Sequence, residues 1–144
     1  MFERLPGVAP ADRKSVALKW LERAVSTESR RQEIAGAALA VIDDERFADL
    51  FGPDALAEAP IAATLPDGRV IAGTVDRLCI GDEVVRVVDF KTGRAVPSGA
   101  ADVPSSHRAQ MQAYADALAV IFPARRIEAA LLYTAGPKLI ILPS

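Results

Sequence analysis

Three charged residues near the middle of the chain could carry out chemistry together. Asp76 lies in the run GTVDRL, and Asp89 and Lys91 follow in the run VVDFKTG. Two carboxylates can hold a hard divalent cation, and such a cation can activate water beside a phosphate. A lysine next to them can offset the negative charge that builds on that phosphate. This set of side chains therefore suits the hydrolysis of a phosphodiester, provided that the fold brings them together.

A hairpin would position the two acids. Residues 69–80 and 83–92 have the composition of strands, and a tight turn at residues 81–82 would join them. Side chains alternate with a period of two, so this register places Asp76 and Asp89 on one face as diagonal neighbours. Their Cβ atoms would then be at most about 7–8 Å apart. A loop with an odd number of residues would send them to opposite faces.

The spacing alone leaves a second interpretation open. Asp89 and Lys91 are also what an ordinary solvated ion pair at the end of a strand looks like, and Asp76 and Arg77 could simply leave the sheet into water. An Asp-x-Lys triplet is too short to separate the two interpretations.

Composition excludes several classes of protein. The chain has 144 residues, of which 51% are hydrophobic, so it can bury a core. Its formal charge of −2 is unlike that of a domain that holds nucleic acid by bulk charge alone. The single cysteine, Cys79, allows neither an internal disulfide nor a cysteine zinc cluster. No signal peptide or membrane span is visible, so we expect a cytoplasmic protein.

The order of elements predicts an α/β or α+β fold with a mixed central sheet flanked by helices. Asp12 could cap the first helix, and Thr27 or Ser29 the second. We expect one domain over residues 1–144, with N-terminal helices over 10–52 and a catalytic core over 58–144. The expected helices are 12–25, 30–44, 45–52 and 107–122, and the expected strands are 60–65, 69–80, 83–92, 127–134 and 138–143.

Three motifs in order resemble those of a known family. GTVDRL (73–78) and VVDFKTG (87–93) fall on the two predicted strands, and QMQAY (110–114) falls on the helix that follows. This arrangement resembles the RecB-like nucleases of the PD-(D/E)XK superfamily, which have a restriction-endonuclease-like core. It is most similar to the C-terminal nuclease domains of the AddA family of helicase–nucleases, of the alphaproteobacterial type. FERLPGV at the start and RRIEAALLYTAGPKLIILP at the end extend this similarity over nearly the whole chain.

The resemblance implies a role for each motif residue. Asp76, Asp89 and the backbone carbonyl of Phe90 would bind Mg²⁺, which Mn²⁺ could replace, and Lys91 would be the catalytic lysine. Gln110 and Tyr114 would brace the site or touch the DNA backbone. Glu58, expected just before the first strand, is a further candidate acid. A half-buried helix face is the alternative for both Gln110 and Tyr114, and a solvated loop glutamate is the alternative for Glu58.

The resemblance also implies a larger context. In this family the nuclease domain belongs to a helicase–nuclease that resects double-strand breaks for recombination. The implied partners are a single DNA strand delivered by the helicase motor, the helicase domains of the same parent chain, and an AddB-like subunit. The family carries a ligand histidine upstream of the segment that matches FERLP, so we expect this chain to be a fragment. The only histidine here, His107, we expect to be a residue at the start of a helix.

Three functions therefore remain open from the sequence. The first is a Mg²⁺-dependent deoxyribonuclease of the exonuclease type. The second is a catalytically inactive, truncated nuclease fold that binds DNA or a partner protein. The third is an unrelated phosphate-handling or metal-binding enzyme that uses the same acidic hairpin.

Overall fold

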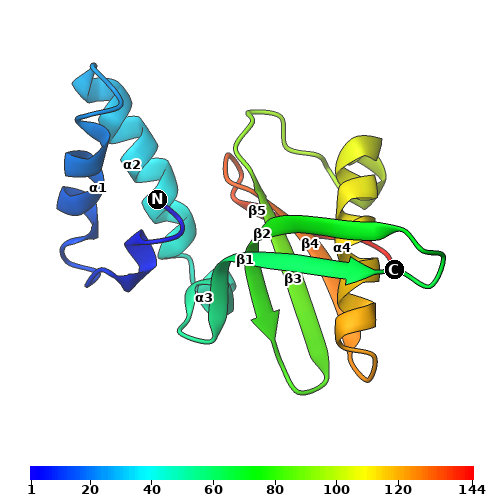
Figure 1. Cartoon of the computed structure of the whole chain (residues 1–144). Coiled ribbons are helices and arrows are strands. Elements are labelled where there is room, and N and C mark those ends of the chain that lie inside the picture. Colours follow the sequence, from blue (N-terminus) through cyan, green and yellow to red (C-terminus); the bar gives the residue numbers. More distant parts are fainter. The chain divides into compact units, whose positions relative to one another are not determined.

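The computed structural model describes all residues from 1 to 144 and divides between Gly52 and Pro53 into two compact units (Figure 1). The first unit is helical. Its core comprises buried Leu5, Ala17, Leu21, Ala35 and Ile42. Its elements are the 3-10 helices η1 (Leu5–Gly7) and η2 (Glu45–Phe47) and the α-helices α1 (Arg13–Leu21), α2 (Glu28–Ile42) and α3 (Ala48–Phe51).

Arg13 joins three segments of this helical unit. Its guanidinium donates to the carbonyl oxygens of Pro6 and Val8, each at 3.0 Å, and forms an ion pair with Asp43 just after α2. Asp12 and Thr27 occupy the expected N-cap positions, but neither side chain makes a capping hydrogen bond.

The second unit is a five-stranded mixed sheet with one long helix. The strand order is β1-β2-β3-β4-β5, and all neighbours are antiparallel except β3 and β4, which run parallel. The connection between β3 and β4 contains η3 (Ala100–Asp102) and α4 (Ser105–Ile121). This confirms the prediction of an α+β fold with a mixed sheet. The strands are β1 (Ala55–Thr64), β2 (Val70–Ile80), β3 (Val84–Lys91), β4 (Arg126–Tyr133) and β5 (Lys138–Ile141).

Helix α4 lies across one face of this sheet, as Figure 1 shows, and packs against β1 to β4. Met111 and Leu118 of the helix are fully buried against Val75, Val87 and Leu131 of the strands. The apolar positions of α4 repeat at helical spacing, which explains why this helix was recognisable from the sequence.

Two sequence predictions in this unit were wrong in detail. The first strand begins at Ala55 rather than at residue 60, because Ala55 and Leu56 pair with Cys79 and Leu78 of β2. Residues 55–59 are rich in alanine, which has a low strand propensity, so this start was not predicted from the sequence. The turn between β2 and β3 is also longer than expected. Ile80 pairs with Val85, so four residues connect the paired positions instead of two.

The backbone conformation of Gly81 explains the longer turn. A two-residue hairpin turn of the favoured type needs a positive φ at its first central residue. Gly81 does not adopt one, and its N–H instead donates to the carbonyl of Val84 at 2.9 Å. No helix in this chain is both long enough and apolar enough to cross a membrane.

Candidate active site

The register of the hairpin brings Asp76 and Asp89 level with each other. Arg77 and Val88 are the last paired residues of the β2–β3 ladder, and Asp76 and Asp89 are the next residue on each strand. The predicted register placed them diagonally, so the pairing was wrong by two residues. Since that error is even, the acids stay on one face, as predicted.

Contacts between the side chains confirm that the acids meet. The Asp89 carboxyl is close enough to raise the pKa of Asp76, and the N–H of Phe90 donates to Oδ2 of Asp76 at 2.7 Å. Nζ of Lys91 lies 2.7 Å from Oδ2 of Asp89, with side-chain exposures of 20% and 15%. The charged groups thus form one half-buried cluster and are not solvated independently at a strand end.

Burial and a neighbouring acid both raise the pKa of Asp76. Desolvation is the main cause that raises its pKa to about 6, and the neighbouring Asp89 carboxyl raises it further. The N–H of Phe90 and the charge of Lys91 oppose this shift. A carboxyl so perturbed, next to a second acid, is typical of a functional site.

The backbone of Phe90 is directed toward Asp76. In an extended strand, the N–H and C=O of one residue point to the same side, and those of the next residue to the other. The carbonyl of Lys91 accepts from the N–H of Thr134 after β4, so Lys91 faces β4. Phe90 therefore faces β2, where its N–H already contacts Asp76. The carbonyl of Phe90 points in the direction that the proposed ligand role needs.

The donor set fits a divalent cation such as Mg²⁺. Carboxylate and carbonyl oxygens are the ligands that this ion prefers, and it usually binds through one or two carboxylates while keeping several waters. The raised pKa of Asp76 reflects negative charge that a cation would offset. The chain offers no group of three or more His, Cys, Asp or Glu side chains that could hold a metal, so the acidic pair would act without a third such ligand.

Glu58 lies inside β1 and not before it. Its flanking residues Ala57 and Ala59 pair with Arg77 and Val75, so Glu58 is level with Asp76 on the neighbouring strand. Its φ of 47° is the one positive φ of a non-glycine residue in the chain, and its side chain is exposed. Strained backbone of this kind is concentrated at functional sites. Even so, its carboxylate does not join the acidic pair in a metal-binding group.

The Gln-x-x-x-Tyr motif lies on α4, as predicted, and its two residues differ in burial. Gln110 is exposed, whereas Tyr114 is half-buried and packs against the main core. A Cβ added to Gly73 would lie 2.8 Å from the hydroxyl of Tyr114 and 2.9 Å from its Cε1. The glycine of GTVDRL therefore makes room for the tyrosine of QMQAY. This contact was not predicted from the sequence, although an isolated glycine inside a strand is a signal of close approach.

Two further polar residues lie near Lys91. Tyr133 is the residue of β4 that pairs with Lys91, and its hydroxyl is buried without a hydrogen-bond partner. His107 lies in the first turn of α4, and its Nδ1 is buried without a partner as well. Tyr133 was not recognised from the sequence, where it reads as the last apolar position of a buried strand.

Comparisons with known proteins give one family. The family model described as "PD-(D/E)XK nuclease superfamily" matches residues 2–139. No curated protein sequence matches the chain. A solved structure titled "Crystal structure of SSO0001" is similar at 19% identity with a TM-score of 0.43. That alignment covers 85% of this chain and 62% of the other, so this chain is comparable to less than two thirds of that protein.

Proposed function

Because the chain belongs to the PD-(D/E)XK nuclease superfamily, we propose that it is a metal-dependent nuclease domain that hydrolyses phosphodiester bonds in DNA. The observation that carries this proposal is the meeting of Asp76, inside β2, with Asp89 and Lys91 near the end of the adjacent strand β3. Two acids and a lysine in one half-buried cluster match the chemistry that phosphodiester hydrolysis needs.

The acids would hold the cation. Asp76 and Asp89 supply carboxylate oxygens, and the carbonyl of Phe90 is directed to the same side of β3. Mg²⁺, or Mn²⁺ in its place, would supply activation of water and compensation of charge on the phosphate. The N–H of Phe90 fixes the carboxyl of Asp76, so this ligand is oriented before a cation arrives.

Lys91 would act on the phosphate. Its ammonium is held 2.7 Å from Asp89, so it would supply a positive charge beside a phosphate bound at the acidic pair. From there it can donate to a phosphate oxygen or orient the attacking water. Tyr114 and Gln110 would brace the site from α4, with exposed Gln110 free to meet the DNA backbone.

The finer assignment concerns the parent protein. We propose that the domain is the exonuclease of an AddA-like helicase–nuclease in double-strand-break repair and recombination in the cytoplasm. Its partners would be a single strand delivered by the motor, the helicase domains of the parent chain and an AddB-like subunit. Support comes from the terminal segments FERLPGV and RRIEAALLYTAGPKLIILP, which accompany the three motifs.

One observation favours a second candidate, a nuclease fold that binds DNA or a partner without cleaving it. The acidic pair has no third His, Cys, Asp or Glu close enough to complete a metal site. Mg²⁺ loses its waters reluctantly, so two carboxylates alone would bind it weakly.

Cleavage of linear single-stranded DNA in the presence of Mn²⁺ separates the two candidates. The nuclease proposal expects cleavage by the wild-type chain and a loss of about 100-fold or more in Asp89→Asn and in Lys91→Ala. Asp67→Asn is the matched control, because Asp67 is an exposed acid paired with Arg69 in the β1–β2 turn. DNA binding without cleavage by the wild-type chain would support the second candidate instead.

A further inference from the structure

A cavity of about 560 Å³ opens beside Lys91, at the ends of β3 and β4. Its walls are the last residues of these two strands, the loop over residues 92–97 and the start of α4. Val96, Pro97 and Pro104 give it an apolar wall, and His107 and Tyr133 also line it. This volume is within the range of cavities that bind small ligands. Phe90 and Lys91 line it as well, so the cavity shares these two residues with the acidic site and extends away from Asp76 and Asp89.

Two residues that line this cavity each carry a buried polar atom without a hydrogen-bond partner. Tyr133 is only 3% exposed, and its buried hydroxyl makes no hydrogen bond. The buried Nδ1 of His107 makes none either. A buried donor or acceptor left unsatisfied destabilises a fold, so native structures rarely keep one without a reason. Two such residues in the wall of one cavity point to a ligand that presents hydrogen-bonding edges.

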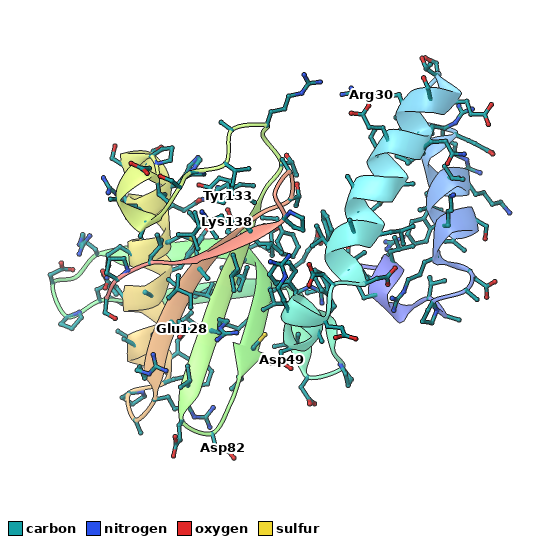
Figure 2. The ribbon with its side chains drawn as sticks, turned by 180° about the vertical axis from the view of Figure 1, so that it is seen from behind. Arg30, Asp49, Asp82, Glu128, Tyr133 and Lys138 are labelled. Carbon is teal, nitrogen blue, oxygen red and sulfur yellow. The ribbon has the colours of Figure 1, made fainter.

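The wall of the cavity is anchored. Nζ of Lys138 on β5 donates to the carbonyls of Pro97 at 3.2 Å and Ser98 at 2.6 Å, and the hydroxyl of Ser98 bonds to Asp102. Figure 2 shows Tyr133 and Lys138 at the same end of the sheet, whereas Asp82 lies at the opposite end of the β2–β3 hairpin. The loop is thus tied to the strands that carry the site, which gives the cavity a defined shape.

We propose that this cavity is a subsite for the nucleobase of a nucleotide next to the scissile phosphate. The inference rests on the proposed nuclease function and adds to it the part of the substrate that is recognised. A base has an apolar face for Val96 and the prolines, and its edge carries donors and acceptors for Tyr133 and His107. Enzymes that take a base out of its stack hold it in this manner, between apolar side chains and hydrogen-bonding groups.

The position of Lys91 connects the subsite to the chemistry. Lys91 lines the cavity and also contacts Asp89, so a phosphate held there leaves the adjoining base at the cavity mouth. Burial raises the pKa of Tyr133, which keeps its hydroxyl protonated and able to donate. Because a base must leave its stack to enter, the subsite favours a single strand over a duplex.

Binding in metal-free buffer tests this inference without cleavage. The probes are deoxynucleoside 5′- and 3′-monophosphates, with deoxyribose 5-phosphate as the probe that lacks a base. We expect the 144-residue chain to bind at least one mononucleotide more tightly than the sugar phosphate. Tyr133→Phe should weaken only the mononucleotide, by about three- to tenfold, the contribution of one hydrogen bond. Equal affinity for the probes with and without a base would overturn the proposal.

A DNA strand with single abasic sites distinguishes a subsite for a base within a substrate strand from a binding site for free nucleotides. Single abasic sites are moved along a short oligonucleotide, and we expect one position to weaken binding to the wild type more than binding to Tyr133→Phe. A mononucleotide effect without this strand effect would indicate a site for free nucleotides and overturn the proposal. Ser106→Ala is the control, because Ser106 is exposed beside His107 and does not line the cavity.

The stability of the variants shows whether a loss of binding comes from the cavity or from unfolding. Tyr133→Phe removes a hydroxyl that has no partner, so we expect its melting temperature to be unchanged or higher. His107→Ala provides an independent second variant with the same expected loss. Base-dependent binding without Mn²⁺-dependent cleavage would keep the subsite and refute the nuclease function, whereas cleavage without base dependence would do the reverse.

Discussion

Asp76 is the residue whose environment differs most from that of a surface acid. It lies half-buried between β1 and β3, beside a second carboxyl, and its pKa is raised from 3.8 to about 6. Its contact with the N–H of Phe90 offsets only part of this destabilisation. In the absence of a cation, the ionised form of Asp76 is therefore a source of instability that the fold tolerates.

The pH dependence of stability should show this effect. A raised folded-state pKa means that the fold favours the protonated acid, so this contribution is full below pH 3.8 and is lost as the pH rises through about 6. Asp76→Asn removes the titration. We expect the variant to gain in melting temperature relative to the wild type between about pH 4.5 and about pH 7.5 in metal-free buffer. If the melting temperatures of Asp76→Asn and the wild type differ by the same amount at both pH values, the raised pKa of Asp76 is contradicted.

Lys91 should separate cation binding from catalysis. Its ammonium competes with a cation for Asp89, because it lies 2.7 Å from that carboxylate. In Lys91→Ala we therefore expect Mn²⁺ binding at least as tight as in the wild type, while cleavage falls about 100-fold or more. Calorimetry and a gel assay on the same preparation measure both quantities. A variant that loses Mn²⁺ binding would show that the lysine is structural.

At the scale of elements, the β2–β3 hairpin could be predicted and its turn could not. The strands are rich in valine and isoleucine, and this pattern is local. The turn depended on the backbone angles of Gly81, which the residue type leaves open because glycine tolerates many conformations. The site survived the error because the loop still has an even number of residues.

Other parts of the site depend on contacts between distant segments. The positive φ of Glu58 and the packing of Tyr114 on Gly73 arise from tertiary pairing, which no local pattern encodes. The motifs gave the identity of the residues, whereas only the fold shows which of them touch.

The contact between Gly73 and Tyr114 gives a test at this scale. Gly73→Ala places a methyl group 2.8 Å from the tyrosine hydroxyl, so we expect a loss of about 1–3 kcal/mol in the free energy of unfolding. In a Tyr114→Ala background the same substitution should cost much less, a coupling that a double-mutant cycle measures. Additive losses would refute the contact.

Gly36→Ala is the matched control for this cycle. Gly36 lies in α2, and an added Cβ meets nothing within 4 Å. We expect this substitution to stabilise the chain by about 0.5–1 kcal/mol, because alanine is the better helix residue.

At the scale of the whole molecule, charge limits how the chain meets DNA. Its formal charge is −2, so its net charge does not attract the polyanion DNA. The acidic pair adds negative charge at the position where the phosphate would bind, and this charge repels the phosphate. Delivery of the strand by another part of a larger protein, as in the proposed AddA-like parent, would resolve this conflict.

The proposed AddA-like parent would allow a separation of functions. In that parent, Lys91→Ala should abolish cleavage by this domain while unwinding and ATP hydrolysis stay near wild type, because Lys91 belongs to the proposed nuclease site and not to the proposed helicase domains. The assay follows an end-labelled duplex with free Mg²⁺ in excess of ATP and any second nuclease site disabled. Cleavage that persists at the wild-type rate would refute the role of Lys91.

The central claim is that Asp76 and Asp89 form one cation site, and titration of Mn²⁺ into the 144-residue chain tests it most directly. We predict a single weak site in the wild type that is lost in Asp76→Asn and in Asp89→Asn and kept in the control Asp67→Asn. Since the raised pKa of Asp76 means that binding must displace a proton below about pH 6, the affinity should also fall at acidic pH. Absence of binding in the wild type, or equal binding in Asp89→Asn, would contradict the account.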